Sequence, residues 1–284
     1  MRAARAGVFA FGAVLALLAA CNEPSLEVGY DEPAVSAGGN HSGGAGAGGS
    51  GGASACIETS CLGKTYKCGN CIDDDGDGYI DAADPECTGP CDNSEDSFFG
   101  DIPGQSGGGC RRDCYFDQDS GSGNDRCDWS YTCDRLSVEP SYPPSGEAAC
   151  VYEETAACAT MRQEQPEACL DMCLPLTPNG CDCFGCCELP ARSGKFVFLG
   201  TQRNGVGTCD IEHVDDPSAC APCTQVPSCL NRCEDCEICA GTTTVGPRCT
   251  GTTALCSVGT PCGPGFTCPG TAYCITGCCI DVPR

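Results

Sequence analysis

Residues 71–87 read Cys71-Ile72-Asp73-Asp74-Asp75-Gly76-Asp77-Gly78-Tyr79-Ile80-Asp81-Ala82-Ala83-Asp84-Pro85-Glu86-Cys87. Aspartates stand at alternate positions from Asp73 to Asp77 and return at Asp81 and Asp84, with glycines between them. Carboxylate and carbonyl oxygens are the ligands that Ca²⁺ prefers, and glycine lets the backbone turn sharply around an ion. The stretch therefore predicts a cation-binding loop.

The spacing resembles the calcium loop of EF-hand proteins, in which positions 1, 3, 5, 7, 9 and 12 supply ligands and glycine stands at position 6. This resemblance implies a Ca²⁺ site made, in order, by Asp73, Asp75, Asp77, Tyr79 through its backbone carbonyl, Asp81 and Asp84, with Gly78 at the turn. We expect Ile80, at position 8, to tuck beneath the loop. The alternative is an acidic, solvated turn without an ion.

The stretch departs from an EF-hand at its end. Asp84 is shorter than the glutamate that grips the ion with both oxygens, and Pro85 disfavours helix for the residue before it. We therefore expect a free-standing loop, clamped by disulfides at Cys71 and Cys87, with a weak affinity of about 10⁻⁴–10⁻³ M. It also resembles the D-x-D-G-D-G metal-binding motif of bacterial surface proteins, including a copper-associated outer-membrane family, and the aspartate-rich repeats of thrombospondin type.

Residues 1–20 have the features of a secretory signal peptide, with two arginines followed by an apolar run too short to span a bilayer. The end of this run, Leu18-Ala19-Ala20-Cys21, resembles the lipobox of bacterial lipoproteins, which implies that Cys21 carries the lipid anchor. A plain signal peptide cut near the same alanines is the alternative. Asn22 is not the aspartate that retains enteric lipoproteins in the inner membrane. We therefore expect an outer-membrane lipid anchor, with the protein facing the periplasm or the cell surface.

Residues 21–55 follow as the lipid anchor and a linker that is nearly all Gly, Ser and Ala from Gly38 to Ala53. Such a segment buries too little apolar surface to offset its ordering entropy, so we expect a flexible tether.

Cysteine is the most informative residue type, with 33 in the chain. Removing Cys21 leaves an even number, and export to an oxidising compartment favours disulfides. Zinc is the competing explanation, but His41 and His213 are the only histidines. The fold class we predict is small and disulfide-rich, mostly irregular with short helices and short β-strands, in one or two cysteine-stapled units behind the tether. The spacing does not determine which cysteines pair.

The cysteine-rich part divides into a calcium-loop segment at 56–91, a first unit at 92–215 and a second at 216–284. Within them we expect a helical stretch over 155–174 that breaks at Gln165-Pro166, and a helix at 227–239 with cysteines along one face. We expect a helical turn at 110–114, and a strand at 195–200 paired with 209–214. Asp117, Asp119 and Asp125 form a weaker candidate for a second cation loop.

The charge balance restricts the partners. The net charge is −24, and loss of Arg2 and Arg5 with the signal peptide makes it two units more negative. Such a chain is repelled by nucleic acid and by anionic membrane surfaces, and it favours cations and basic protein partners.

The combination of lipobox, Gly-rich tether, D-D-D-G-D-G loop and dense cysteines ending in G-C-C resembles uncharacterised cysteine-rich lipoproteins of the myxobacterial type. No function comes with that resemblance. We expect a non-enzymatic, lipid-anchored envelope or surface protein with a calcium-stabilised head that acts as a binding or structural module. The alternatives are a disulfide-rich protease inhibitor or effector, suggested by the spacing after Cys249, and a thiol redox or hydrolytic enzyme. The redox alternative rests on five C-x-x-C spacings and the hydrolytic one on His213 among carboxylates.

Overall fold

The structure is a computed structural model that describes residues 56–61, 63–101, 110–117, 125–136, 150–249, 256, 259–262, 268–270 and 272–281. The chain divides into two units, Met1–Gly49 and Ser50–Arg284, and all described residues belong to the second. The predicted signal peptide, Cys21 and the Gly-rich linker lie outside the described residues.

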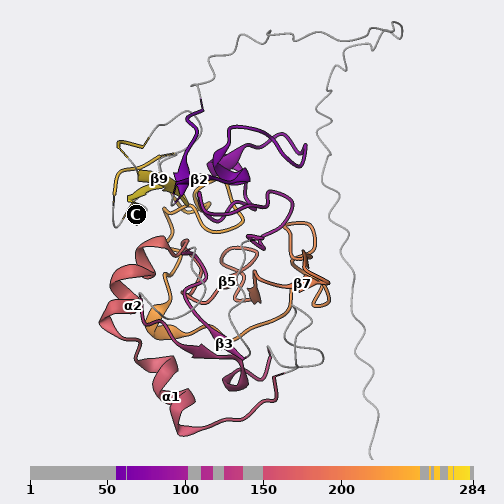
Figure 1. Cartoon of the computed structure of the whole chain (residues 1–284), viewed down its shortest axis with the longest axis vertical. Coiled ribbons are helices and arrows are strands. Elements are labelled where there is room, and N and C mark those ends of the chain that lie inside the picture. Colours follow the sequence, from indigo (N-terminus) through magenta and orange to yellow (C-terminus); the bar gives the residue numbers. More distant parts are fainter. Residues whose placement is uncertain are drawn as a thin grey trace, which may run out of the picture. The chain divides into compact units, whose positions relative to one another are not determined.

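The described regular structure is short and local, as Figure 1 shows. Five antiparallel strand pairs join β1–β2, β3–β4, β5–β6, β7–β8 and β9–β10. Their bounds are Ser60–Cys61 and Lys64–Thr65, Arg111–Arg112 and Trp129–Ser130, Cys186–Glu188 and Phe196–Phe198, Gln202–Arg203 and Val206–Gly207, and Ala272–Ile275 and Cys278–Asp281. The α-helices are α1 at Ala156–Gln163 and α2 at Glu167–Met172, and the 3₁₀ turns η1–η5 lie at Lys67–Gly69, Asp81–Ala83, Tyr131–Cys133, Leu174–Leu176 and Pro227–Cys229.

Disulfides supply the framework that these short elements do not. Sixteen disulfides pair every cysteine among the described residues, so the predicted disulfide-rich, mostly irregular fold is confirmed. They fall into five consecutive sets along the chain: 56–71, 61–91 and 68–87; 110–150, 114–173, 127–169 and 133–158; 181–187, 183–229, 186–223 and 209–220; 233–239 and 236–249; and 256–278, 262–274 and 268–279. No bridge joins one set to another.

The disulfide sets can be compared with the predicted boundaries of the cysteine-rich part. The first set begins at Cys56 and ends at Cys91. Three bridges of the third set cross the predicted boundary after residue 215. Residues on both sides of that boundary also share one buried cluster, to which Tyr115 and Phe198 contribute before it and Val226 and Tyr273 after it. The proposed segments stay a prediction, but disulfides link residues 92–215 to residues 216–284.

The buried core contains few aliphatic and aromatic side chains. Cysteines make up more than half of its hydrophobic residues, and the remainder centres on a few aromatic rings. Phe198 packs edge-on against Tyr115 and Tyr131, and the Arg112 guanidinium lies over the rings of Tyr131 and Phe198. Gly185 has a positive φ, and a side chain there would collide with the Tyr115 ring. The aromatic packing therefore depends on a glycine turn as well as on bridges.

The predicted helical stretch over 155–174 is confirmed with its break. Thr155 caps α1, and the chain leaves the helix before Pro166, after which α2 begins. Cys169, in α2, forms a disulfide with Cys127. Cys173, the residue directly after α2, forms one with Cys114. Both bridges anchor this region to residues earlier in the chain.

Three expectations for local structure are wrong. The predicted helix at 227–239 is only the 3₁₀ turn η5, because Cys229, Cys233 and Cys236 bond in different directions and Leu230 forms a bridge with Asp182. The strand β6 pairs with β5, its neighbour in a hairpin, rather than with 209–214. The expected helical turn at 110–114 is instead the strand β3, which pairs with β4.

None of the described helices is both long and apolar enough to cross a bilayer.

Candidate metal centre

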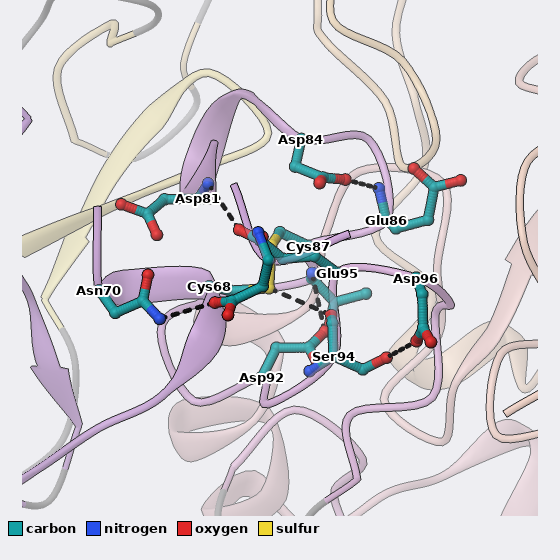
Figure 2. Close-up of a disulfide and its surroundings, with 12 residues drawn as sticks. Cys68, Asn70, Asp81, Asp84, Glu86, Cys87, Asp92, Ser94, Glu95 and Asp96 are labelled. Atoms are coloured by element: carbon teal, nitrogen blue, oxygen red, sulfur yellow. Dashed lines mark hydrogen bonds between the residues drawn. A yellow bond between two sulfur atoms is a disulfide. The ribbon is translucent and has the colours of Figure 1, made fainter. Parts of the chain in front are cut away.

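The acidic loop is framed covalently. Figure 2 shows the Cys68–Cys87 disulfide next to Glu95, and the Cys56–Cys71 disulfide fixes the residue at which the loop begins. The predicted clamps at Cys71 and Cys87 are therefore present, although these two cysteines do not bond to each other. After the 3₁₀ turn η2, Asp84 is extended and no helix follows. Disulfides thus take the place of the helices that flank an EF-hand loop.

The first half of the loop is folded by its own aspartates. Asp73 accepts hydrogen bonds from the Gly76 and Gly78 amides at 2.6 and 3.1 Å. Asp75 accepts from the Asp77 amide at 3.0 Å, and Asp77 in turn accepts from the Tyr79 amide at 2.8 Å. Each bond reaches two to five residues onward, so the backbone wraps around the first three predicted ligands.

These three carboxylates also repel one another. Burial raises the pKa of Asp75, and the negative charges of Asp77 and Asp73 raise it further. A cation placed among them would remove this repulsion, because opposite charge favours the ionised form. The arrangement is suited to a divalent ion.

Asp81, the residue at position 9, is placed differently. Its backbone has φ +49° and its carboxylate accepts the Cys71 amide, with the shorter contact at 3.0 Å. Burial raises the pKa of this carboxyl. In EF-hand loops position 9 often contacts the ion through water, so this placement is compatible with an indirect role.

Glu95 is a structural acid that the sequence pattern did not identify. It is 1% exposed, and its two oxygens accept the Asp74 amide at 2.6 Å and the Asp81 amide at 3.0 Å. Figure 2 shows it beside the Cys68–Cys87 bridge. Glu95 therefore joins both halves of the loop from below. It lies outside the repeating motif, so no spacing could have identified it.

The last predicted ligand, Asp84, is paired with a second unpredicted acid, Glu86. The two side chains are 4% and 5% exposed, and Asp84 Oδ1 accepts the Glu86 amide at 2.7 Å (Figure 2). Asp84 Oδ2 and Glu86 Oε2 are buried and accept no hydrogen bond. Burial raises the pKa of both carboxyls, that of Asp84 to about 8, and the charge of Asp77 adds to the effect on each. Buried carboxyl oxygens without donors are costly unless a proton or a cation satisfies them.

Two residues of the loop face outward. The side chains of Tyr79 and Ile80 are 45% and 39% exposed. Exposure of Tyr79 is consistent with a role for its carbonyl alone. The expectation that Ile80 tucks beneath the loop is wrong, because Glu95 and the Cys68–Cys87 bridge lie there instead.

A cleft borders the end of the loop. Asp84 lines it together with Thr88, Thr276 and the segment 238–243.

The structure describes only some of the other sequence-based candidates. Asp117 and Asp125 are described, whereas Asp119 and the linker residue His41 lie outside the described residues. His213 is exposed, and its Nδ1 pairs with Asp210 at 2.7 Å.

None of the C-x-x-C pairs that suggested redox chemistry forms a disulfide between its own two cysteines. The five pairs are 68/71, 183/186, 220/223, 233/236 and 236/239. Every one of these cysteines bonds to a partner outside its own C-x-x-C pair.

Comparison with known proteins gives no relative from which to transfer a role: no family model, no curated protein and no solved structure matches the chain.

Proposed function

We propose that this protein is a non-enzymatic, lipid-anchored envelope or surface protein whose disulfide-rich folded part is stabilised by Ca²⁺ and serves as a binding or structural module. The observation that carries the calcium part is the pair of buried, donor-free oxygens on Asp84 and Glu86 at the end of a cross-linked acidic loop.

The ligand chemistry supports calcium over zinc or copper. The candidate donors are the carboxylates of Asp73, Asp75, Asp77 and Asp84 and the carbonyl of Tyr79, with Asp81 acting through water. Ca²⁺ takes six to eight such oxygens, whereas zinc and copper favour nitrogen and sulfur. Every cysteine near the loop is in a disulfide, which leaves no thiolate to compete.

Calcium is expected to bind and to stabilise the protein. We expect isothermal titration of the purified folded part to give a dissociation constant of about 10⁻⁴–10⁻³ M. Saturation at 100 times that constant adds about 2.7 kcal/mol to the free energy of unfolding, so EGTA lowers the melting temperature and exposes the loop to proteases. Melting and proteolysis that are unchanged by EGTA would contradict the calcium proposal.

A matched pair of variants locates the effect in the loop. Asp75→Ala removes a predicted ligand and should lose the calcium response. Asp74→Ala removes the same charge next to it, but Asp74 is not at a ligand position, and its carboxylate accepts from the exposed Asn70 amide. Equal losses in both variants would mean that the loop responds to general charge rather than to an ion at the predicted ligands.

Anchoring is tested separately at Cys21. We expect Cys21→Ser to abolish incorporation of labelled fatty acid and to move the protein from the membrane fraction to the soluble fraction. A wild-type protein that takes up no label would contradict the lipoprotein part of the proposal and leave the calcium part intact.

The module's partner is expected to be basic or to approach through a cation. The chain carries a net charge of −24, which opposes nucleic acid and anionic lipid surfaces. Held at the outer membrane through Cys21, an acidic head on a tether would reach basic proteins or other surface macromolecules without contacting the lipid itself.

A further inference from the structure

We infer that Glu86 is an additional calcium ligand from outside the twelve-residue loop and that, through it, the bound ion fixes the backbone at Ile211. The inference rests on the proposed calcium site and names a residue and a coupling that the loop motif does not contain.

The two oxygens of Glu86 have different environments. Oε1 accepts the Ile211 amide at 2.9 Å, a contact that links positions 125 residues apart. Oε2 is buried and has no hydrogen-bond partner. The side chain is therefore held in place by one oxygen while the other is available to a ligand.

The Glu86 carboxyl lies next to the Asp84 carboxyl at the end of the loop. Asp84 has extended φ and ψ, and residues 84–86 form a bend in which Asp84 Oδ1 accepts the Glu86 amide at 2.7 Å, so the two residues stay close together. Asp84 and Glu86 interact with each other, and both are influenced by the charge of Asp77. Among the described residues, no Lys, Arg or His forms an ion pair with Asp84 or Glu86. Two neighbouring buried carboxyls can share one proton, and a bound divalent cation would displace that proton and neutralise both groups.

The local sequence explains why a residue outside the loop is needed. An EF-hand loop ends on a glutamate whose length allows both oxygens to reach the ion. Asp84 is one methylene shorter, and residues 84–86 form a bend instead of continuing as a helix, as Pro85 favours. The longer side chain of Glu86 then follows two residues on, where it supplies the missing reach.

The coupling follows from the contact at Ile211. The Ile211 side chain packs against the main core, and Cys209, two residues before it, is bonded to Cys220. An ion that holds the Glu86 carboxylate in place also keeps its Oε1 positioned to accept the Ile211 amide. Calcium binding would then order the backbone at Ile211, which lies in the third disulfide set and not in the first set that contains the loop.

The test compares calcium titrations of wild type, Glu86→Gln, Glu86→Asp and Glu58→Gln in the full-length protein. Glu86→Gln keeps the size of the side chain and an oxygen for Ile211, and Glu86→Asp keeps the charge but shortens the reach. Both should weaken calcium binding at least tenfold. Glu58→Gln alters an exposed glutamate of the same disulfide set and should bind like wild type.

A second measurement follows the Ile211 amide by hydrogen exchange. Calcium should slow its exchange at least tenfold in wild type and have no such effect in Glu86→Gln. If wild type binds calcium and either Glu86 variant binds equally well, or if calcium leaves Ile211 exchange unchanged, the inference is overturned while the calcium site stands. If wild type takes up no calcium, the proposed site fails, and the inference fails with it.

Discussion

Reduction of the disulfides is expected to unfold the described part of the chain completely at room temperature. A bridge contributes about 2–4 kcal/mol, mainly by restricting the unfolded chain, and a domain is stable by only about 5–15 kcal/mol in total. The described helices α1 and α2 are short, and each described sheet is a single strand pair, which is marginal by itself. Since cysteines dominate the buried hydrophobic residues, little packing would remain once the thiols separate.

The measurement combines circular dichroism with mass spectrometry. When the protein is unfolded in denaturant without reduction, iodoacetamide should alkylate none of the cysteines after Cys21, because each of them is in a disulfide. After dithiothreitol it should add one adduct for every such cysteine, and the near-ultraviolet signal of the buried aromatic rings should disappear. Retention of that signal in the fully reduced protein would show that packing, and not cross-linking, stabilises the fold.

Replacing Asp182 by alanine should cost about 3 kcal/mol or more of folding stability. The Asp182 side chain is fully buried and accepts three backbone amides, from Phe184 and Cys186 at 2.9 Å and from Val226 at 2.7 Å. Each buried amide that loses its acceptor costs about 1–3 kcal/mol. Denaturant unfolding measures the loss, and Asp171→Ala on the exposed side of α2 should change stability by less than about 0.5 kcal/mol.

The same residue gives stability a pH dependence of defined sign. Burial raises the pKa of Asp182 from 3.8 to about 7, against the opposing effect of its amide donors. A carboxyl that holds its proton more tightly when folded stabilises the fold fully below pH 3.8, and this contribution is lost as the pH rises through 7. Comparison of wild type with Asp182→Asn should therefore show the wild-type advantage shrinking between pH 4 and 7, by up to about 1.4 kcal/mol per pH unit. An advantage that grows with pH would show that the three amides keep the carboxylate ionised.

The fold class could be predicted because it follows from composition. An even number of cysteines after Cys21, few large apolar side chains and features of export leave little besides disulfides to stabilise a fold. The break between α1 and α2 was predictable because Pro166 acts locally. The failed helix at 227–239 shows the limit: cysteines at helical spacing favour a helix only if they bond on one side, and the partners of Cys229, Cys233 and Cys236 are set by tertiary structure.

The candidate site divides in the same way. The motif predicted the residues whose carboxylates fold the loop, Asp73, Asp75 and Asp77, because their hydrogen bonds reach only a few positions along the chain. It gave no indication of Glu95, whose partners lie 14 and 21 residues earlier. Glu86 left a readable signal, since it follows the proline that prevents the exiting helix. Its contact with Ile211 depends on packing that no local pattern encodes.

The division of the bridges into five consecutive sets has a consequence for biogenesis. Under the proposed export, a chain threaded from its N-terminus would present its cysteines to the oxidising machinery in order. Because no bridge joins one set to the next, the cysteines from Cys56 to Cys91 can all find their partners before Cys110 emerges, and each later set can close in turn. Mispairing is then confined to a few neighbouring thiols at a time, which reduces the number of wrong connectivities that an isomerase must undo.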